Sequence, residues 1–435
     1  MPIGSGYFIQ LDIPDEAFAA YRAGKELAGR QQYTEAIIEF GRAIAFIEAP
    51  PAFRARVFER RGECYWYLGD FAAAGQDYRA ALETCDDPGQ IARARARLGE
   101  VADSTGHYTE AAALFNSALR EGLAAGDLIA IGRAQRGLGI VHRRQGNTDQ
   151  AISHLTQALA AFRQAGDARQ QARVLSSLGR TRFARGEYQA AITAFQEALK
   201  IDEAMGDRWR YVLGLNDLGE CHRTLFDIDT ARQYHEQALE MAERFGANVL
   251  KPDIQQNLGN DLVESGRLRM GVVHLQQALE GSRALNKRET EAMILYSLVP
   301  AYIEMKDMGA AAQAVADLSV LANDIGADRY RSLAAFRRGE LLFVQGNRIP
   351  AVAELQTAML AAQTSLDLGV LWRLHALMSE VVDDESIASV HTQIAAGFIR
   401  QAIDPLQDQT LKLRFVNAPQ VKRVLVAAGI DPNRL

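Results

Sequence analysis

Cysteine, lysine and long apolar runs are all scarce in this chain of 435 residues. Its three cysteines, Cys64, Cys85 and Cys221, show no CxxC spacing, so we expect no disulfide framework and reduced, mostly buried thiols. No apolar run approaches the roughly 18 residues that are needed to cross a bilayer. The first residues also lack a charged segment followed by a long apolar one. These absences predict a soluble, cytoplasmic protein.

Positive charge is not in excess either. The formal net charge is −6, whereas chains that bind nucleic acid are usually basic, so the composition gives no support for that role. Arginine supplies nearly all of the positive charge, with 41 arginines against seven lysines. The chain contains no GxxxxGK(S/T) phosphate loop, no GxSxG elbow and no HExxH zinc motif. We therefore expect no cofactor and no metal.

An internal repeat is what the sequence does contain. Its glycines recur along the whole chain, at a step of 40 residues from Gly99 onward: Gly24, Gly62, Gly99, Gly139, Gly179, Gly219, Gly259 and Gly339, with Val299 on the same grid. Small residues follow at twelve and nineteen positions further, for example Ala191 and Ala198 after Gly179, with Leu318 the one large exception. Such a fixed period indicates a repeat architecture.

Each repeat reads as two amphipathic helices joined by a short turn. The turn often carries a glycine, which can adopt the left-handed conformation that ends a helix. The small residues of the two helices face each other, and larger residues fill the remaining gap: Tyr78, Phe115, Leu155, Phe195 and Leu275. One such pair cannot bury its apolar face alone, so the repeats must stack.

These positions resemble the tetratricopeptide repeat, a helix–turn–helix of 34 residues. The period of 40 implies longer helices and is similar to Pins-like and MalT-like arrays and to the C-terminal repeat region of bacterial AAA-type signalling ATPases. The resemblance implies an all-α, right-handed superhelical solenoid of about nine repeats with a C-terminal capping helical unit. We predict an N-terminal segment over 1–16, an array over 17–368 and a degenerate repeat with its cap over 369–435. The repeats are expected to begin near residues 17, 55, 92, 132, 172, 212, 252, 292 and 332.

The C-terminal segment resembles the closing part of such arrays in bacterial regulators. The matching positions are Trp372, Arg373, Leu374, His375, Asp408, Leu411, Phe415, Pro419, Val421 and Leu425. A solenoid leaves its last apolar face uncovered, so the tail is expected to fold back over the final repeat. The apolar stretch YFIQLDI over 7–13 is expected to cover the other end, or to be the remnant of a larger protein.

Glu220, Cys221 and His222 stand side by side in the sixth repeat and suggest a catalytic site. Adjacent helical residues point about 100° apart, so Cys221 and His222 cannot readily chelate one metal together. The same two slots hold Glu26 and Leu27 in the first repeat, so they accept assorted side chains. We interpret both residues as helix-packing positions, with a Cys–His enzyme as the less favoured alternative.

The resemblance also implies where a partner binds. In such arrays the first helix of each repeat lines the concave face, and its inner positions contact the ligand. Carried over, these positions are Arg93, Arg97, Arg133, Arg136, Arg143, Arg144, Arg173, Arg180, Asn216, Arg223, Asn257 and Asn260. Arginine forks suit carboxylates, which implies a peptide with acidic residues or a C-terminal carboxylate. Alternatively, the arginines cover helix surface and pair with Glu100, Asp103 and Glu220.

The sequence therefore predicts a non-enzymatic scaffold or adaptor in bacterial signalling, which holds a partner segment in its groove. A peptide-responsive sensor that controls an output partner is the alternative function. Another protein or peptide is the expected partner, and neither nucleic acid nor a membrane is expected.

Overall fold

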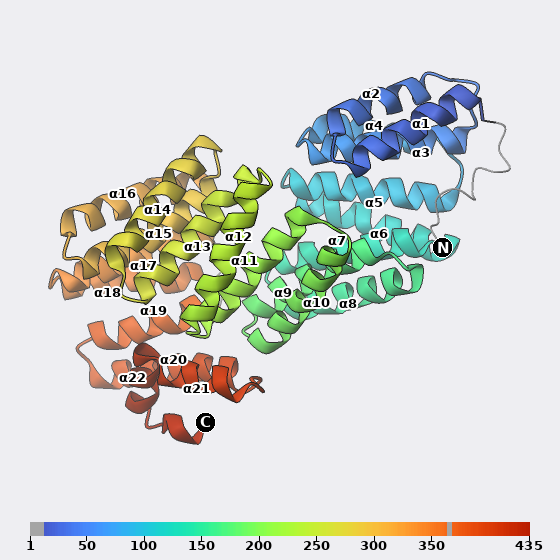
Figure 1. Ribbon diagram of the computed structural model, residues 1–435. Helices are drawn as coiled ribbons and strands as arrows, with labels where there is room; N and C mark the ends of the chain where they lie inside the picture. The colour runs from blue at the N-terminus through green and yellow to red at the C-terminus, as the bar shows by residue number, and fades with distance from the viewer. Residues whose placement is uncertain (1–12, 363–367) are drawn as a thin grey trace. The chain divides into compact units, whose positions relative to one another are not determined.

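Only helices and their connecting turns make up residues 13–362 and 368–435, the part of the chain that the computed structural model describes (Figure 1). The chain divides into two compact units, Met1–Val174 and Leu175–Leu435. The predicted N-terminal cap over 7–13 lies, except for Ile13, outside the described residues. Among the described residues, no helix is both long enough and apolar enough to cross a membrane.

Unit 1 contains α1 (Asp15–Gly29), α2 (Tyr33–Ile44), α3 (Pro51–Tyr67), α4 (Phe71–Thr84), α5 (Pro88–Ser104), α6 (Tyr108–Ala125), α7 (Leu128–Arg144) and α8 (Thr148–Ala165). Helix α9 (Ala168–Ala184) crosses the boundary between the units. Unit 2 continues with α10 (Tyr188–Ala204), α11 (Arg208–Thr224), α12 (Ile228–Arg244), α13 (Lys251–Glu264), α14 (Leu268–Ala284), α15 (Arg288–Glu304), α16 (Met308–Ile325), α17 (Asp328–Val344), α18 (Arg348–Ala362), α19 (Leu368–Val381), α20 (Glu385–Ile403), α21 (Gln409–Asn417) and α22 (Pro419–Ala427).

Consecutive helices pack in pairs, an odd-numbered A helix against the even-numbered B helix that follows it. The repeat spacing therefore predicted the all-α fold class and the helix pairing correctly. Most helices of the array are 17 or 18 residues long, as expected for a period of 40.

The repeated glycine of each A helix lies directly against a large side chain of the B helix. A Cβ atom placed on Gly99 would lie 2.7 Å from the ring of Phe115, and one on Gly179 would lie 2.6 Å from the ring of Phe195. Three occupants of the same position were not predicted from the sequence: Phe40, His235 and Leu355. Glycine is thus required here for close approach, because any side chain would displace the ring.

Gly-Asp pairs between repeats end one helix and begin the next. Gly126 has φ 65° and the left-handed conformation at the end of α6. The carboxylate of Asp127 then accepts hydrogen bonds from the backbone N–H groups of Ile129 (3.0 Å) and Ala130 (2.9 Å) at the start of α7. These contacts satisfy backbone groups that both helix ends otherwise leave unpaired.

We call the C-terminal helices α19–α22 the closing module. Its first helix, α19, covers the ninth repeat, because Leu374 and Met378 share a buried cluster with Leu355 of α18. The tail residues that were expected to cover the final repeat share a buried cluster with residues of α10, α11 and α20: Phe415, Val421, Val424 and Leu425. Leu368 lies against Gly186, and Gln401 donates to the carbonyl of Arg185 at 3.5 Å. The tail thus reaches back to the fifth and sixth repeats, so unit 2 closes on itself.

One turn shows how this closure is built. The turn after α11 has Phe226 with φ 59°, where six other repeats of the array have a glycine: Gly69, Gly106, Gly146, Gly186, Gly266 and Gly346. A bulky residue rarely adopts this conformation, which costs about 1–2 kcal/mol. The ring of Phe226 packs against that of Phe415 in the closing module, with 5.6 Å between centroids. Contact with the module thus offsets an unfavourable backbone conformation.

Substitution Gly179→Ala should lower the free energy of unfolding by about 1–3 kcal/mol, because the added methyl group collides with the ring of Phe195. Gly397→Ala in α20 is the matched control, since no atom lies within 4 Å of its added Cβ. We expect that control to stabilise the helix by about 0.5–1 kcal/mol. Urea denaturation measures both, and equal effects of the two substitutions would contradict the packing described.

Comparison with Lys306 separates the backbone strain at Phe226 from the contacts of its ring. Lys306 is an exposed residue whose φ is 62° in the equivalent turn of the eighth repeat. Lys306→Gly should raise the free energy of unfolding by about 1 kcal/mol, because glycine relieves the backbone. Phe226→Gly gives the same relief but removes ring contacts worth about 2 kcal/mol or more. The midpoint temperature of thermal unfolding should therefore be higher than that of the wild type for Lys306→Gly and lower for Phe226→Gly.

Candidate partner-binding site

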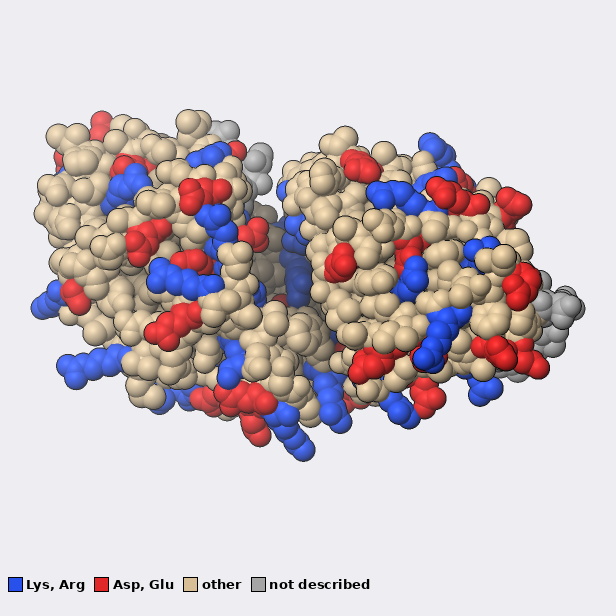
Figure 2. All heavy atoms as spheres, turned by 90° about the horizontal axis from the view of Figure 1, so that it is seen from above, with Lys and Arg blue, Asp and Glu red and all other residues tan. Residues whose placement is uncertain are grey.

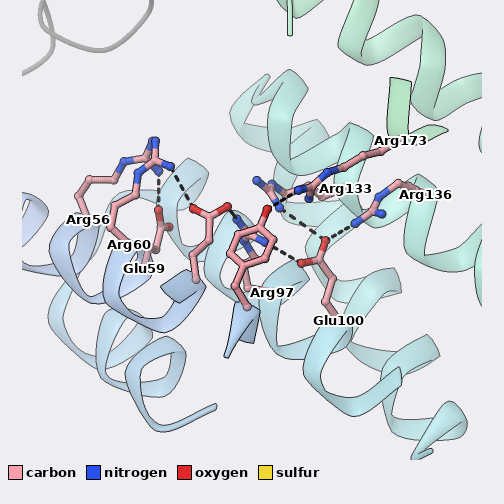
Figure 3. A network of polar contacts seen from close by, with 10 residues as sticks. Arg56, Glu59, Arg60, Arg97, Glu100, Arg133, Arg136 and Arg173 are labelled. Carbon is pink, nitrogen blue, oxygen red and sulfur yellow. Dashed lines mark hydrogen bonds and ion pairs between the residues drawn. The ribbon is translucent and has the colours of Figure 1, made fainter. Parts of the chain in front are cut away.

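The A helices of unit 1 bring charged side chains together on one side of the stack (Figure 3). Helices α3, α5 and α7 contact one another in turn, and α9 contributes Arg173 from its first half. We call the resulting group the arginine cluster: Arg60, Glu63, Tyr67, Arg97, Glu100, Arg133, Arg136 and Arg173. Four of its members, Arg97, Arg133, Arg136 and Arg173, were predicted as ligand-contacting positions.

Two carboxylates organise the arginine cluster. Glu100 lies 2.9 Å from Arg97, 2.6 Å from Arg136 and 3.5 Å from Arg133. Glu63 lies 2.5 Å from Arg97 and 3.0 Å from Arg60. The alternative interpretation of the sequence, in which the arginines pair with neighbours such as Glu100, therefore describes these contacts correctly. Most of the side chains in the arginine cluster are nearly buried.

The pairing nevertheless leaves a surplus of positive charge. Five arginines face two glutamates in the cluster, a net charge of +3. Burial, together with the nearby Arg97, lowers the pKa of Arg133 to about 10. Burial alone would raise the pKa of Glu100, but Arg97, Arg136 and Arg133 outweigh it and hold this pKa at about 2. An additional anion would thus be stabilised here, because it relieves repulsion between partly desolvated cations.

The remaining predicted arginines of unit 1 have carboxylates of their own nearby. Arg93 pairs with Asp127 at 2.9 Å. Arg143 and Arg144 lie in the last turn of α7, where the Nε atom of Arg144 is 3.2 Å from Asp103. Asp103 is influenced electrostatically by Arg144, Arg143 and Arg136 together, which connects these residues to the arginine cluster.

The other five predicted residues belong to unit 2. Arg180 pairs with Asp217 at 3.0 Å, and Arg223 lies 3.3 Å from Glu264. The side chain of Asn257 donates to that of Asn216 at 3.1 Å. Asn260 lines a cavity of unit 2.

A buried hydrogen bond between a histidine and an aspartate underlies the asparagine pair, and the sequence did not predict it. His235 and Asp261 have no solvent exposure and are 2.6 Å apart, Nδ1 to Oδ2. The second ring nitrogen of His235 lies 3.3 Å from the backbone oxygen of Asn216. His235 occupies the position that Phe195 or Leu275 fills in other repeats. The 40-residue period identifies position 235 as one that holds a large packing residue. It does not reveal the partner Asp261, which comes from the next repeat.

The structure places the three thiols away from any nucleophilic role. Cys221 is fully buried in the cluster that joins α11 to the closing module, and burial raises its pKa well above the usual range. Burial likewise raises the pKa of Cys64 to about 12. A protonated thiol is a poor nucleophile, so this geometry does not favour a Cys–His enzyme. Across residues 13–362 and 368–435, no group of three or more ligating side chains could hold a metal ion.

The outer surface carries charge of both signs. On the face drawn in Figure 2, acidic and basic side chains are interspersed among uncharged ones. On this face no large region carries charge of one sign only.

Comparison with known proteins identifies the repeats. The family model of the tetratricopeptide repeat matches residues 53–120 and 130–204, so the predicted resemblance is confirmed. No curated protein sequence matches the chain.

Several solved structures share the fold. A Rap protein complexed with competence and sporulation factor has a TM-score of 0.58 at 11% identity, over 80% of this chain and 99% of that one. A signal transduction ATPase with a tetratricopeptide repeat sensor, from Pyrococcus horikoshii, has a TM-score of 0.55 at 14% identity, over 81% of this chain and 54% of that one. Aspartyl phosphate phosphatase F from Bacillus subtilis has a TM-score of 0.52 at 12% identity, over 81% and 95%. At these identities the likeness is one of fold.

Glu100→Gln should lower the free energy of unfolding at pH 7 by about 3 kcal/mol, because it leaves buried arginines without their shared carboxylate. The folded pKa of about 2 lies below the value of about 4.3 for an unfolded glutamate. The stability from Glu100 is therefore present above pH 4.3 and is lost as the pH falls towards 2. Urea denaturation from pH 7 to 2 should show the wild type and the variant converging.

The exposed Glu110 of α6 supplies the control. Glu110→Gln should change the free energy of unfolding by less than about 0.5 kcal/mol at any of these pH values. A Glu100 variant that behaves like this control would show that the carboxylate does not hold the arginine cluster together.

Proposed function

We propose that this tetratricopeptide-repeat array is a non-enzymatic scaffold that binds an acidic segment of a partner protein at the arginine cluster. The observation that carries the proposal is the net charge of +3 on nearly buried side chains of consecutive A helices. Clustered arginines that repel one another favour an anionic ligand, because its carboxylates replace the missing counter-charges.

The chemistry of the cluster suits carboxylates on an extended chain. Arg133 and Arg136 already share Glu100, and the Nε–H group of Arg136 has no hydrogen-bond acceptor among the described residues. A guanidinium group has five N–H donors in a planar fork, so each arginine can bind a second carboxylate. Arginines on successive A helices thus offer successive contacts to one acidic segment.

The comparisons support a role in protein interaction. One structure of the same fold is that of a Rap protein complexed with competence and sporulation factor, and another belongs to a signal transduction ATPase. We infer by analogy that this chain also acts in bacterial signalling or regulation. Affinity would come from many modest contacts on a preformed surface.

The double substitution Arg133→Gln/Arg136→Gln tests the proposal, since it lowers the charge of the cluster to +1 and leaves Arg97 with both glutamates. The full chain is titrated with fluorescein-labelled hexaglutamate, and binding is followed by fluorescence anisotropy. We expect the wild type to bind with an affinity that falls as salt is raised. The variant should bind about tenfold more weakly.

Hexaglutamine is the peptide control, and Arg42→Gln/Arg120→Gln is the protein control. Arg42 and Arg120 are exposed on the B helices α2 and α6, so their loss changes the net charge equally without touching the cluster. Equal loss of binding in the two double variants would show that only net charge matters. Undiminished binding by the Arg133/Arg136 variant would refute the proposed site.

A further inference from the structure

Unit 2 contains a cavity of about 900 Å³ that the closing module helps to form. Its walls come from the A helices α11, α13, α15, α17 and α19, and residues of α21 and α22 complete them. The volume lies within the range of pockets that hold small molecules and cofactors, roughly 300–1,000 Å³.

Contacts at the rim keep the closing module in place beside the cavity. Phe226 packs on Phe415, and Arg414 of α21 pairs with Asp227. His222 also lies 3.1 Å from Asp227, so this carboxylate connects the sixth repeat to the module. An A-helix face closed in this way is suited to a compact ligand, because the module occupies the path that an extended chain would follow.

Most arginines on the cavity wall already have a carboxylate partner. Arg223 is 3.3 Å from Glu264, and Arg337 is 2.7 Å from Glu340. Two more arginines of the cavity wall lie in the closing module. Arg414 pairs with Asp227, and Arg423 pairs with Glu380. These pairs neutralise their own charges and leave little attraction for a ligand.

Arg373 differs from them. Within the described part of the chain, its guanidinium group has no carboxylate partner and donates only to the backbone oxygen of Gly369, at 2.7 Å. It stacks at 4.6 Å from the ring of Trp372 and at 5.8 Å from the ring of Phe226. The stacked rings hold the guanidinium plane in one orientation, with several N–H donors available.

We propose that this cavity binds a small monoanionic ligand in which a carboxylate stands beside an aromatic or apolar group, with the carboxylate on Arg373. The guanidinium group of Arg373, which has no carboxylate partner among the described residues, matches a single negative charge, and its planar fork matches a carboxylate. Phe336 and Met293 offer an apolar wall for the remainder of the ligand, and Asn260 offers an amide. The proposal is independent of the arginine cluster, which belongs to unit 1.

The anionic aromatic dye 8-anilinonaphthalene-1-sulfonate is the probe, and its neutral relative N-phenyl-1-naphthylamine is the control. Both are titrated into the full chain and followed by fluorescence. We expect one saturable site for the anionic dye, with binding about tenfold weaker in Arg373→Gln and intermediate in Arg373→Lys. Arg400→Gln, on the exposed side of α20, should bind the dye as the wild type does. The neutral dye should bind Arg373→Gln and wild type equally.

Competition on the wild-type protein tests the ligand class without any substitution. Indole-3-acetate should displace the dye at a concentration at least about tenfold lower than indole-3-acetamide, which lacks only the charge. Phenyl phosphate should compete less well than indole-3-acetate. Dye affinity that Arg373→Gln leaves unchanged would overturn the proposed anchor. Equal competition by the acid and the amide, or stronger competition by phenyl phosphate, would overturn the carboxylate class.

Discussion

The close approach of two helices at a glycine is the contact on which the other features depend. Where Gly99 meets Phe115, the absence of a side chain lets the ring of the B helix lie directly on the backbone of the A helix. Repetition of this contact gives every pair the same thickness, so the A helices stack at a regular spacing. That spacing brings Arg97, Arg133 and Glu100, from neighbouring repeats, within reach of one another.

Features that recur in every repeat could be predicted from the sequence. The helix pairs, the glycine positions and the Gly-Asp boundaries follow from local packing and capping rules, and the structure confirms them. The arginines of the cluster could be placed on one helix face for the same reason. The net charge of the arginine cluster could not be predicted, because Glu63 and Glu100 neutralise arginines of other repeats. The sequence of a single repeat does not reveal these pairs.

Features that occur once were predicted poorly. The apolar residues of the tail showed that something must be covered, but their spacing does not say which surface is left uncovered. The tail packs on α10 and α11, and this position depends on how the rotations between successive repeats add up. Phe226 was visible in the sequence only as a missing turn glycine, and His235 only as a departure at one position. The two units thus differ, since unit 1 follows the repeat pattern closely and unit 2 adds a closure.

The contact between Phe226 and Phe415 gives unit 2 a fixed length. A stack that ends freely can gain or lose a repeat during evolution, since each repeat touches only its neighbours. Between α12 and α19, by contrast, three repeats separate two surfaces that must meet. Duplication or deletion of one of these repeats would move the closing module away from its docking surface. The number of repeats in this part of the chain is therefore under structural constraint, whereas their individual sequences are free to diverge.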